Sequence, residues 1–272
     1  MNRIKLKDFF ISNDLPFVLI AGPCALENKN HAFEMIEEIL EITTKLKINF
    51  IFKTSFDKAN RTNIKSERGT GIQEAVNVFK EIKNKYNCPI LTDIHNESQI
   101  PIISEVVDII QIPAFLCRQT DLIVNAAKTK KIINIKKGQF LSPYEVPEVI
   151  NKITSSGNTN VILTERGYSF GYNNLITDFR SLEIMKKTNF PVIFDATHSV
   201  QEPGLQGSSS GGRREFIPTL SKAAIAVGIA GIFVETHNDP DNAPSDGPNM
   251  LPLNELKNLL IKLIEFDKVA KS

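Results

Sequence analysis

Several features that would place the chain in a specialised class are missing from its sequence. Lys plus Arg total 32 and Asp plus Glu total 31 among 272 residues, so no excess charge favours a nucleic-acid or membrane partner. Residues 1–14 lack the apolar core and cleavage site of a signal peptide, and the apolar run 15–20 is far too short to span a bilayer. We therefore expect a cytoplasmic protein that binds neither nucleic acid nor membrane.

Cysteine is also scarce. The three cysteines, Cys24, Cys88 and Cys117, do not form the pattern of a disulfide framework. In a reducing compartment an isolated thiol either fills the core or serves as a metal ligand or catalytic group. Both interpretations stay open for each of the three at this point.

No composition shift, long linker or internal repeat divides the chain. With 42% hydrophobic and 23% charged residues, it suits one soluble domain spanning 1–272. Short runs rich in Ile, Val, Leu and Phe predict eight strands, at 17–21, 49–53, 90–93, 109–112, 132–136, 160–165, 191–195 and 231–235. Such near-continuous apolar content is typical of parallel strands that are covered on both faces.

Amphipathic stretches lie between these strands. They predict helices over 32–46, 71–86, 122–130, 175–187, 213–227 and 253–269. Eight strands alternating with helices predict a (β/α)8 TIM barrel of the α/β class. We expect residues 1–16 to form an N-terminal extension that caps the bottom of the barrel.

A barrel of this kind predicts that reactive groups gather just after each strand. The sequence fits that prediction at all eight strand ends, which carry Cys24; Lys53 with Lys58 and Arg61; Asp93 with His95; Gln111 leading to Arg118; Lys136 with Lys137; Glu165 with Arg166; Asp195 with His198; and Glu235 with His237. Three of the four histidines belong to this set. We therefore expect the functional site at the carboxyl-terminal face of the barrel.

The segment 52–62, FKTSFDKANRT, concentrates positive and amide groups at one strand end. It contains Lys53, Lys58, Asn60 and Arg61. Clustered cations are unfavourable unless an anion compensates them, which favours a phosphate or carboxylate ligand over a solvated basic loop. The same face carries further cations at Arg118, Lys136 and Arg166. Together they predict a substrate, or two substrates, with more than one anionic group.

A second set of groups could bind a metal ion. A thiolate, an imidazole and two carboxylates, from Cys24, His198, Glu235 and Asp246, suit a divalent transition metal better than Mg²⁺ or Ca²⁺. Spacing alone supports this set weakly. Cys24 could instead fill the core, His198 could cap a helix, and Asp246 could be a turn residue in SDGP.

The stretch 205–212 has the composition of a mobile loop. Its Ser210 precedes a predicted helix, whose free N–H groups favour a phosphate. The stretch is either a lid over a substrate phosphate or a plain connector.

Nine motifs carry a resemblance to a known family: AGPCALEN, FKTSFDKANRT, TDIHN, IPAFLCRQTDL, NIKKGQFLSP, LTERGYSFGYNNL, FDATHSVQEPG, SGGRREF and ETHNDPDNAPSDGPN. Together, over about residues 17–250, they resemble the 3-deoxy-D-manno-octulosonate 8-phosphate synthases. Those enzymes condense phosphoenolpyruvate with D-arabinose 5-phosphate and water, in the synthesis of the lipopolysaccharide inner core. The resemblance implies a TIM barrel that assembles as a homotetramer.

The resemblance also implies roles for individual residues. Lys53, Lys58, Lys136 and Arg166 would hold the phosphate and carboxylate of phosphoenolpyruvate. Asn60, Arg61, Thr62 and Ser210 would hold arabinose 5-phosphate, and Arg118 would reach that site from a neighbouring subunit. Thr62 stands where the family usually has serine, and it keeps the hydroxyl group.

The family has a metal-dependent branch with cysteine after the first strand, and Cys24 places the chain closer to that branch. The implied ligands are Cys24, His198, Glu235 and Asp246, which would hold Zn, Fe, Mn or Co. Lys136 and His198 would then act in catalysis. Asp93, His95 and Asp195 would either handle protons or make buried structural hydrogen bonds.

The nearest alternative is a 3-deoxy-D-arabino-heptulosonate 7-phosphate synthase, which uses erythrose 4-phosphate. Its loop usually reads KPRT where this chain has KANRT. Asn60 can hydrogen-bond a hydroxyl of the longer sugar and proline cannot, which favours arabinose 5-phosphate. A sugar-phosphate sensor without catalytic activity should lack part of the metal set or of the cations, and here both sets are complete.

Overall fold

The computed structural model describes every residue except 62 and 205–210. Eight parallel strands form a closed barrel: β3 (Val18–Gly22), β4 (Phe50–Lys53), β5 (Ile90–Asp93), β6 (Ile109–Ile112), β7 (Ile132–Lys136), β8 (Val161–Glu165), β11 (Val192–Asp195) and β14 (Gly231–His237). The ring closes because β14 pairs with both β11 and β3. The predicted single-domain (β/α)8 barrel is thus confirmed, and each predicted strand lies within two residues of an observed one.

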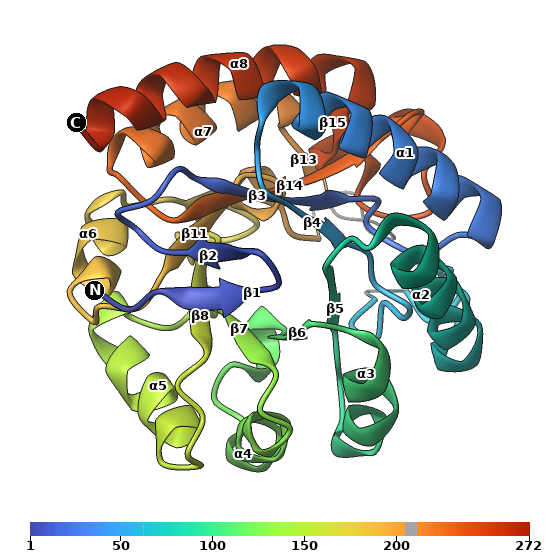
Figure 1. The fold of residues 1–272 in the computed structure, drawn as a ribbon, viewed down its shortest axis with the longest axis horizontal. Coiled ribbons are helices and arrows are strands. Elements are labelled where there is room, and N and C mark those ends of the chain that lie inside the picture. Colours follow the sequence, from blue (N-terminus) through green and yellow to red (C-terminus); the bar gives the residue numbers. More distant parts are fainter. Residues whose placement is uncertain (62, 205–210) are drawn as a thin grey trace.

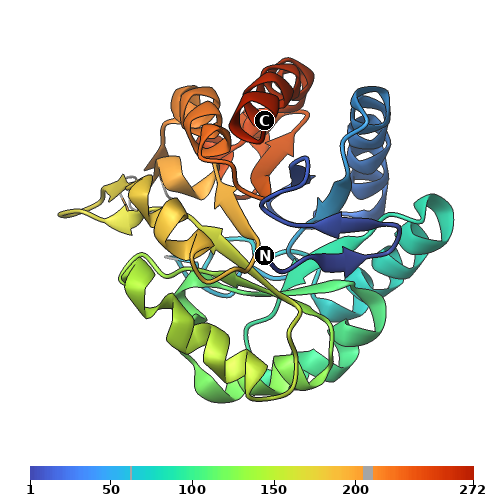
Figure 2. The ribbon, with the colours of Figure 1, turned by 60° about the vertical axis from the view of Figure 1, so that its left-hand side comes forward.

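Within the described parts of the chain, helices surround the strands (Figures 1 and 2). They are α1 (Lys29–Leu46), α2 (Ile72–Tyr86), α3 (Ile100–Val106), α4 (Thr120–Lys128), α5 (Val146–Thr154), α6 (Arg180–Lys186), α7 (Ile217–Ala226) and α8 (Leu253–Ala270). The sequence predicted all of these except α3 and α5, which have only 7 and 9 residues. Both carry proline in the first turn, where its missing N–H costs nothing, so proline here starts a helix.

Two predicted helices begin later than expected. The stretch 175–187 opens with β10 (Leu175–Ile176), which pairs with β9 (Tyr168–Ser169) in a hairpin that projects from the ring (Figure 2). The stretch 213–227 opens with a 3₁₀ turn before α7.

The remaining short strands are β1 (Ile4–Leu6), β2 (Phe9–Ile11), β12 (Gln201–Glu202), β13 (Gly211–Gly212) and β15 (Leu251–Pro252). The 3₁₀ turns are Glu97–Gln99, Ala114–Leu116, Pro143–Glu145, His198–Val200, Arg214–Phe216, Pro240–Asn242 and Gly247–Asn249. In the described parts of the chain, no helix has the length and apolar character needed to cross a membrane.

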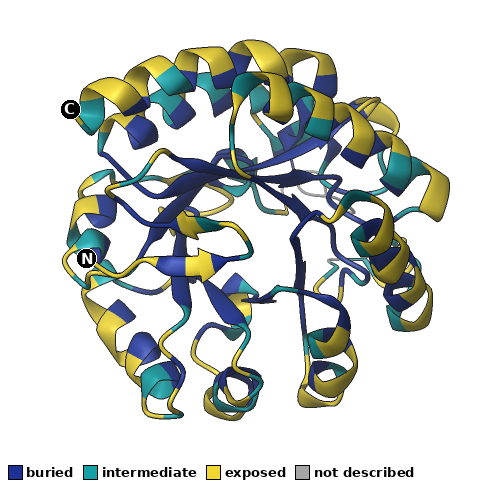
Figure 3. Ribbon diagram, viewed as in Figure 1, coloured by how far each residue is buried: buried dark blue, intermediate teal, exposed yellow. Residues whose placement is uncertain are grey.

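The inside of the barrel is apolar at one end and polar at the other. Successive side chains of a strand point to opposite faces, so residues two apart share a face. The inward apolar residues Ile51, Leu91, Ile109, Ile132, Ile162, Ile193 and Phe233 form one buried cluster with Ile4, Leu6 and Ile11 of the β1–β2 hairpin. Two residues further along the same strands come Lys53, Asp93, Gln111, Asn134, Thr164, Asp195 and Glu235, all of which are buried. The strand register therefore stacks a polar layer on an apolar floor, and Figure 3 shows the strands buried throughout.

The C-terminal helix ties the start of two barrel strands together. The Asp267 carboxylate accepts a hydrogen bond from the Phe17 backbone N–H at 3.0 Å. The Lys271 ammonium lies 2.6 Å from the same carboxylate and donates to the carbonyls of Leu15 and Ile229, just before β3 and β14. This buried contact holds the lower rim of the barrel where the chain enters it.

Replacing Asp267 by Ala should therefore destabilise the fold. The change leaves the buried N–H of Phe17 without its acceptor and removes the carboxylate that faces the Lys271 ammonium, and we expect a loss of about 2–4 kcal/mol in the free energy of unfolding. Urea denaturation followed by circular dichroism measures it. The control is Glu41→Ala, which removes an exposed ion pair with Lys45 and should change stability very little. Equal effects of the two substitutions would contradict the assignment.

Candidate active site

A cleft of about 450 Å³ opens at the carboxyl-terminal ends of the strands. Among the predicted site residues, those that line it are Lys53, Lys58, Asn60, Arg61, Asp93, His95, Lys136, Arg166, His198 and Asp246. These side chains come from six segments far apart in the sequence, and the barrel brings them to one face. The predicted location of the site is thus where the structure has its polar cleft.

The floor of the cleft holds the carboxylate of Glu235, which is fully buried. The ammonium of Lys53 lies 2.6 Å from its Oε1 atom, and the ammonium of Lys58 lies 3.9 Å from the same atom. Burial by itself raises the pKa of the Glu235 carboxyl, but Lys53 and Lys58 outweigh burial and hold that pKa well below its usual range. Glu235 is therefore a carboxylate whose charge the two lysines compensate.

Lys53 reaches this place because β3 and β4 approach closely at their ends. Gly22, with φ +151°, lies so close to β4 that a Cβ atom there would be 2.1 Å from the Lys53 carbonyl oxygen. The Lys53 ammonium also donates to the Cys24 carbonyl at 3.3 Å. A side chain at Gly22 would push the two strand ends, and the groups that follow them, apart.

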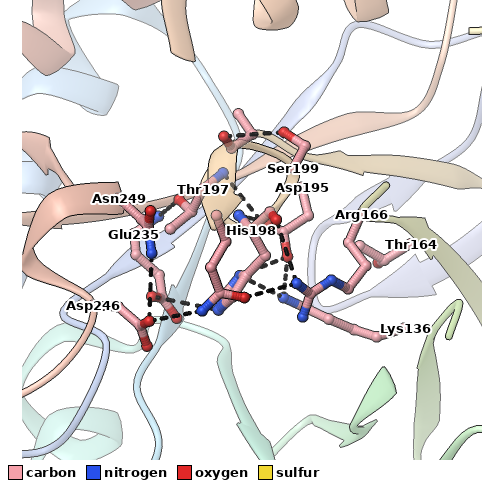
Figure 4. A network of polar contacts seen from close by, with 12 residues as sticks. Lys136, Thr164, Arg166, Asp195, Thr197, His198, Ser199, Glu235, Asp246 and Asn249 are labelled. Carbon is pink, nitrogen blue, oxygen red and sulfur yellow. Dashed lines mark hydrogen bonds and ion pairs between the residues drawn. The ribbon is translucent and has the colours of Figure 1, made fainter. Parts of the chain in front are cut away.

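A second ion cluster centres on Asp195, which is also fully buried (Figure 4). Its carboxylate contacts the Lys136 ammonium and, at 2.8 Å, the Nδ1 atom of His198. It also accepts the backbone N–H groups of Thr197 and His198. Burial lowers the pKa of Lys136 to about 8, although Asp195 opposes the shift. Asp195 thus fixes the imidazole by one nitrogen and leaves its Nε2 atom directed elsewhere.

That Nε2 atom lies 3.8 Å from Oε2 of Glu235, at the edge of a candidate metal site. Ligand atoms of Cys24, Glu235 and Asp246 all lie within 4.8 Å of one another, and the Cys24 thiol is 3.1 Å from Oδ2 of Asp246. Oε2 of Glu235 is buried and has no hydrogen-bond partner among the described residues. The structure therefore brings the four predicted ligands together, with His198 slightly outside the tight group of three.

The surroundings of Cys24 disfavour the charged form of its thiol. Burial, and after it the carboxylate of Glu235, raises its pKa well above the usual range. A thiolate beside two carboxylates needs a cation to compensate it, and a divalent metal ion supplies one. The donor set and the unpaired Glu235 oxygen therefore fit a bound metal.

Arg166 is buried and bridges to the metal cluster through a residue that sequence reasoning missed. Its guanidinium donates to Oε1 of Gln201 at 2.9 Å, and Gln201 donates from Nε2 to Oδ1 of Asp246 at 2.9 Å. Nε of Arg166 is buried with no partner among the described residues. Gln201 lies in the FDATHSVQEPG motif, but a neutral side chain gave no charge signal that would have singled it out.

The basic segment after β4 forms another part of the cleft wall. Arg61 donates to the hydroxyl of Ser245 at 2.7 Å and to the carbonyls of Pro244 and Glu67 at 2.9 and 2.8 Å. Asn60 is exposed beside it. Thr62 and Ser210 lie outside the described residues. The structure thus places Asn60 and Arg61 at the cleft and adds Ser245, which carries no charge and was not predicted.

Asp93 and His95 pair at the third side of the cleft. Nε2 of His95 lies 3.1 Å from Oδ2 of Asp93. Burial by itself raises the pKa of the Asp93 carboxyl. The hydrogen bond from His95 and the charge of His95 outweigh burial, so the pKa is lowered overall and the carboxylate stays ionised. Oδ1 of Asp93 and Nδ1 of His95 lack partners within the described parts of the chain, which leaves two buried polar atoms for a ligand.

Arg118 does not line the cleft of its own chain. It is exposed beyond the 3₁₀ turn Ala114–Leu116 that follows β6. Its predicted role in the cleft of a neighbouring subunit stays a prediction.

Another cluster with metal-ligand chemistry lies outside the cleft and consists of Glu27, His31 and His237. Nδ1 of His237 accepts the backbone N–H of Asp239 at 2.8 Å, so its proton sits on Nε2, 2.7 Å from Glu27. Hydrogen bonds thus account for His237, which has no lone pair free for a metal.

Comparison with known proteins places the chain in a family. The DAHP synthetase I family matches residues 2–272. A 2-dehydro-3-deoxyphosphooctonate aldolase of Brucella anthropi is 57% identical over 270 residues, which cover 99% of this chain and 98% of that protein. Proteins of the same name from Brucella ovis and Brucella suis biovar 1 are 56% identical over 271 residues, covering 100% of this chain and 98% of each. The chain therefore belongs to the DAHP synthetase I family.

Proposed function

We propose that the protein is a 3-deoxy-D-manno-octulosonate 8-phosphate synthase. It condenses phosphoenolpyruvate with D-arabinose 5-phosphate and water, and it releases inorganic phosphate. One observation carries the proposal: a single cleft gathers several cations beside a cluster of thiol, imidazole and carboxylates, in a chain 57% identical to a 2-dehydro-3-deoxyphosphooctonate aldolase. The product named in that relative is the eight-carbon sugar acid phosphate that this condensation yields.

Phosphoenolpyruvate binds among Lys53, Lys58, Lys136 and Arg166. Lys53 and Lys136 are each in close contact with a buried carboxylate. Arg166, by contrast, keeps a buried N–H with no partner among the described residues, and the Lys58 ammonium is 3.9 Å from Glu235. Arg166 and Lys58 are therefore the cations most available to the phosphate and carboxylate of the substrate. Lys53 and Lys136 add positive potential from below.

Arabinose 5-phosphate binds at the wall that carries Asn60 and Arg61, together with Thr62 and Ser210. The Arg61 guanidinium now holds Ser245 and Pro244, and it would exchange part of this contact for the phosphate. We further propose a homotetramer in which Arg118 of a neighbouring subunit completes this wall. Support comes from the exposure of Arg118 outside its own cleft. A monomer in sedimentation equilibrium would refute the tetramer.

A divalent transition metal (Zn, Fe, Mn or Co) is held by Cys24, His198, Glu235 and Asp246, as in a metal-dependent branch of the family. When bound, it supplies a Lewis acid that orients and polarises an oxygen of the water or of the aldehyde. Asp195 prepares His198 for this role, because it occupies Nδ1 and directs Nε2 toward Glu235.

The reaction joins C3 of the enol to C1 of the open-chain aldehyde, whose oxygen takes up a proton. Water then adds to C2 and loses a proton. The new C2 hydroxyl loses its own proton as the bond from C2 to the phosphate oxygen breaks, which forms the C2 ketone and releases inorganic phosphate. Groups that can move protons form two sets at the cleft: His198 with Asp195 and Lys136, and His95 with Asp93. Lys136, with a pKa of about 8, can give up its proton near neutral pH more readily than an ordinary lysine.

The acceptor decides between this function and its four-carbon relative. Phosphate release from phosphoenolpyruvate should be at least about tenfold more efficient, as kcat/KM, with arabinose 5-phosphate than with erythrose 4-phosphate, because Asn60 can hydrogen-bond the longer sugar. A coupled phosphate assay with both acceptors in parallel measures the ratio. A preference for erythrose 4-phosphate would overturn the proposal. If no phosphate is released with either acceptor present, the protein is a binding protein and not an enzyme.

Replacing Cys24 tests the metal site. Chelation should abolish wild-type activity, and Mn²⁺, Fe²⁺, Co²⁺ or Zn²⁺ should restore it to different degrees. Cys24→Ala removes one of four ligands and should be inactive under chelation. Cys24→Asn should retain measurable activity there, because an amide can hold by hydrogen bonds part of what a metal holds by coordination. Both variants should stay folded, since the site lies at the mouth of the barrel.

Cys88→Ala is the matched control for these two variants. Cys88 is a buried thiol outside the cleft, so its loss should leave the metal dependence unchanged. The metal assignment fails if wild-type protein, shown by elemental analysis to hold no metal, turns over at its full rate.

A further inference from the structure

Gln201 joins two parts of the cleft that the proposed function treats separately. Its amide accepts from the Arg166 guanidinium and donates to the Asp246 carboxylate, each at 2.9 Å. A guanidinium can only donate and a carboxylate can only accept, so the orientation of this amide is forced by its two neighbours. Figure 4 shows Arg166 and Asp246 on opposite sides of His198. The Gln201 amide is hydrogen-bonded to both Arg166 and Asp246.

The backbone of Gln201 is itself held in place. Its N–H closes the 3₁₀ turn by donating to the His198 carbonyl, and the residue pairs with Gly212 across the β12–β13 ladder. The His198 carbonyl also accepts from Arg166 at 3.3 Å. The side chain therefore extends from a backbone that is held in place. A shift of the Asp246 carboxylate would move the Gln201 amide and, through it, the Arg166 guanidinium.

Few side chains could make this link. A glutamate would set a carboxylate against Asp246, and a lysine or arginine would set a cation against Arg166. Asparagine is shorter by one methylene and could not keep both 2.9 Å contacts from the same backbone place. A neutral group with an acceptor at one end and a donor at the other is what the two neighbours require.

We infer that Gln201 is a positioning residue that couples metal binding to phosphoenolpyruvate binding. The inference rests on the proposed function, in which Asp246 is a metal ligand and Arg166 binds phosphoenolpyruvate. A metal that fixes Asp246 also fixes Arg166 through the amide, so the second ligand meets a site already ordered by the first. By linkage the effect is reciprocal: phosphoenolpyruvate tightens the hold on the metal by the same factor.

Calorimetry on wild-type protein and on Gln201→Met tests the coupling without relying on activity. Phosphoenolpyruvate is titrated into metal-stripped and Mn²⁺-loaded protein, and the Mn²⁺ dissociation constant is measured by chelator competition. In the wild type, Mn²⁺ should lower the dissociation constant for phosphoenolpyruvate by roughly fivefold or more. Methionine keeps the length of the side chain but neither hydrogen bond, so this factor should shrink roughly fivefold.

Gln73→Met, at an exposed place on α2, is the matched control and should bind both ligands as the wild type does. An unchanged coupling factor in Gln201→Met overturns the inference, even if both affinities fall, because a purely structural role would weaken each ligand without uncoupling them. Thermal denaturation shows whether the variant is folded. Wild-type protein that fails to bind Mn²⁺ or phosphoenolpyruvate would instead refute the proposed function, and the inference with it.

Discussion

The buried carboxylate of Glu235 is the group on which the rest of the site depends. One of its oxygens compensates the ammonium groups of Lys53 and Lys58, and the other is unpaired within the described residues, facing Cys24 and Asp246. Burying a charge costs free energy of solvation unless an opposite charge lies beside it. The two lysines and the Glu235 carboxylate therefore stabilise one another only while they are in contact. The same carboxylate can therefore serve an anion site and a cation site at once. Separating the two sites would leave one of them uncompensated.

The barrel meets this constraint through strand periodicity. On seven of the eight barrel strands, an inward-facing isoleucine, leucine or phenylalanine in the apolar layer is followed two residues later by a polar group, as in Ile51 and Lys53 or Phe233 and Glu235. On β3, Ile20 is followed by Gly22 instead. The apolar layer, with the β1–β2 hairpin packed on it, keeps water from reaching the charges from below. Opposite charges attract more strongly where water is excluded. Moving any one of these groups away from its partner therefore costs more free energy than it would at the surface.

Much of this arrangement could be predicted from the sequence because burial leaves a pattern. The barrel strands are apolar on both faces, so their runs stand out and were placed within two residues. Helices α3 and α5 have 7 and 9 residues and each carries proline in its first turn, which interrupts the helical pattern, and β9 and β10 have two residues each. Charged site residues were found because strand ends concentrate them. Gln201 and Ser245 were not, since their importance comes from contacts with Arg166, Asp246 and Arg61 that no local pattern encodes. The role of Arg118 needs a second subunit.

The position of a bound metal ion is the main claim, and anomalous X-ray diffraction from crystals grown with Mn²⁺ or Zn²⁺ tests it directly. We expect one strong anomalous peak per chain, from a metal ion bound by Sγ of Cys24, Nε2 of His198 and the carboxylates of Glu235 and Asp246. The Lys53 ammonium should remain against Glu235 on the side away from the metal. A peak at Glu27 and His31 instead, or no peak at metal concentrations that support full activity, would contradict it.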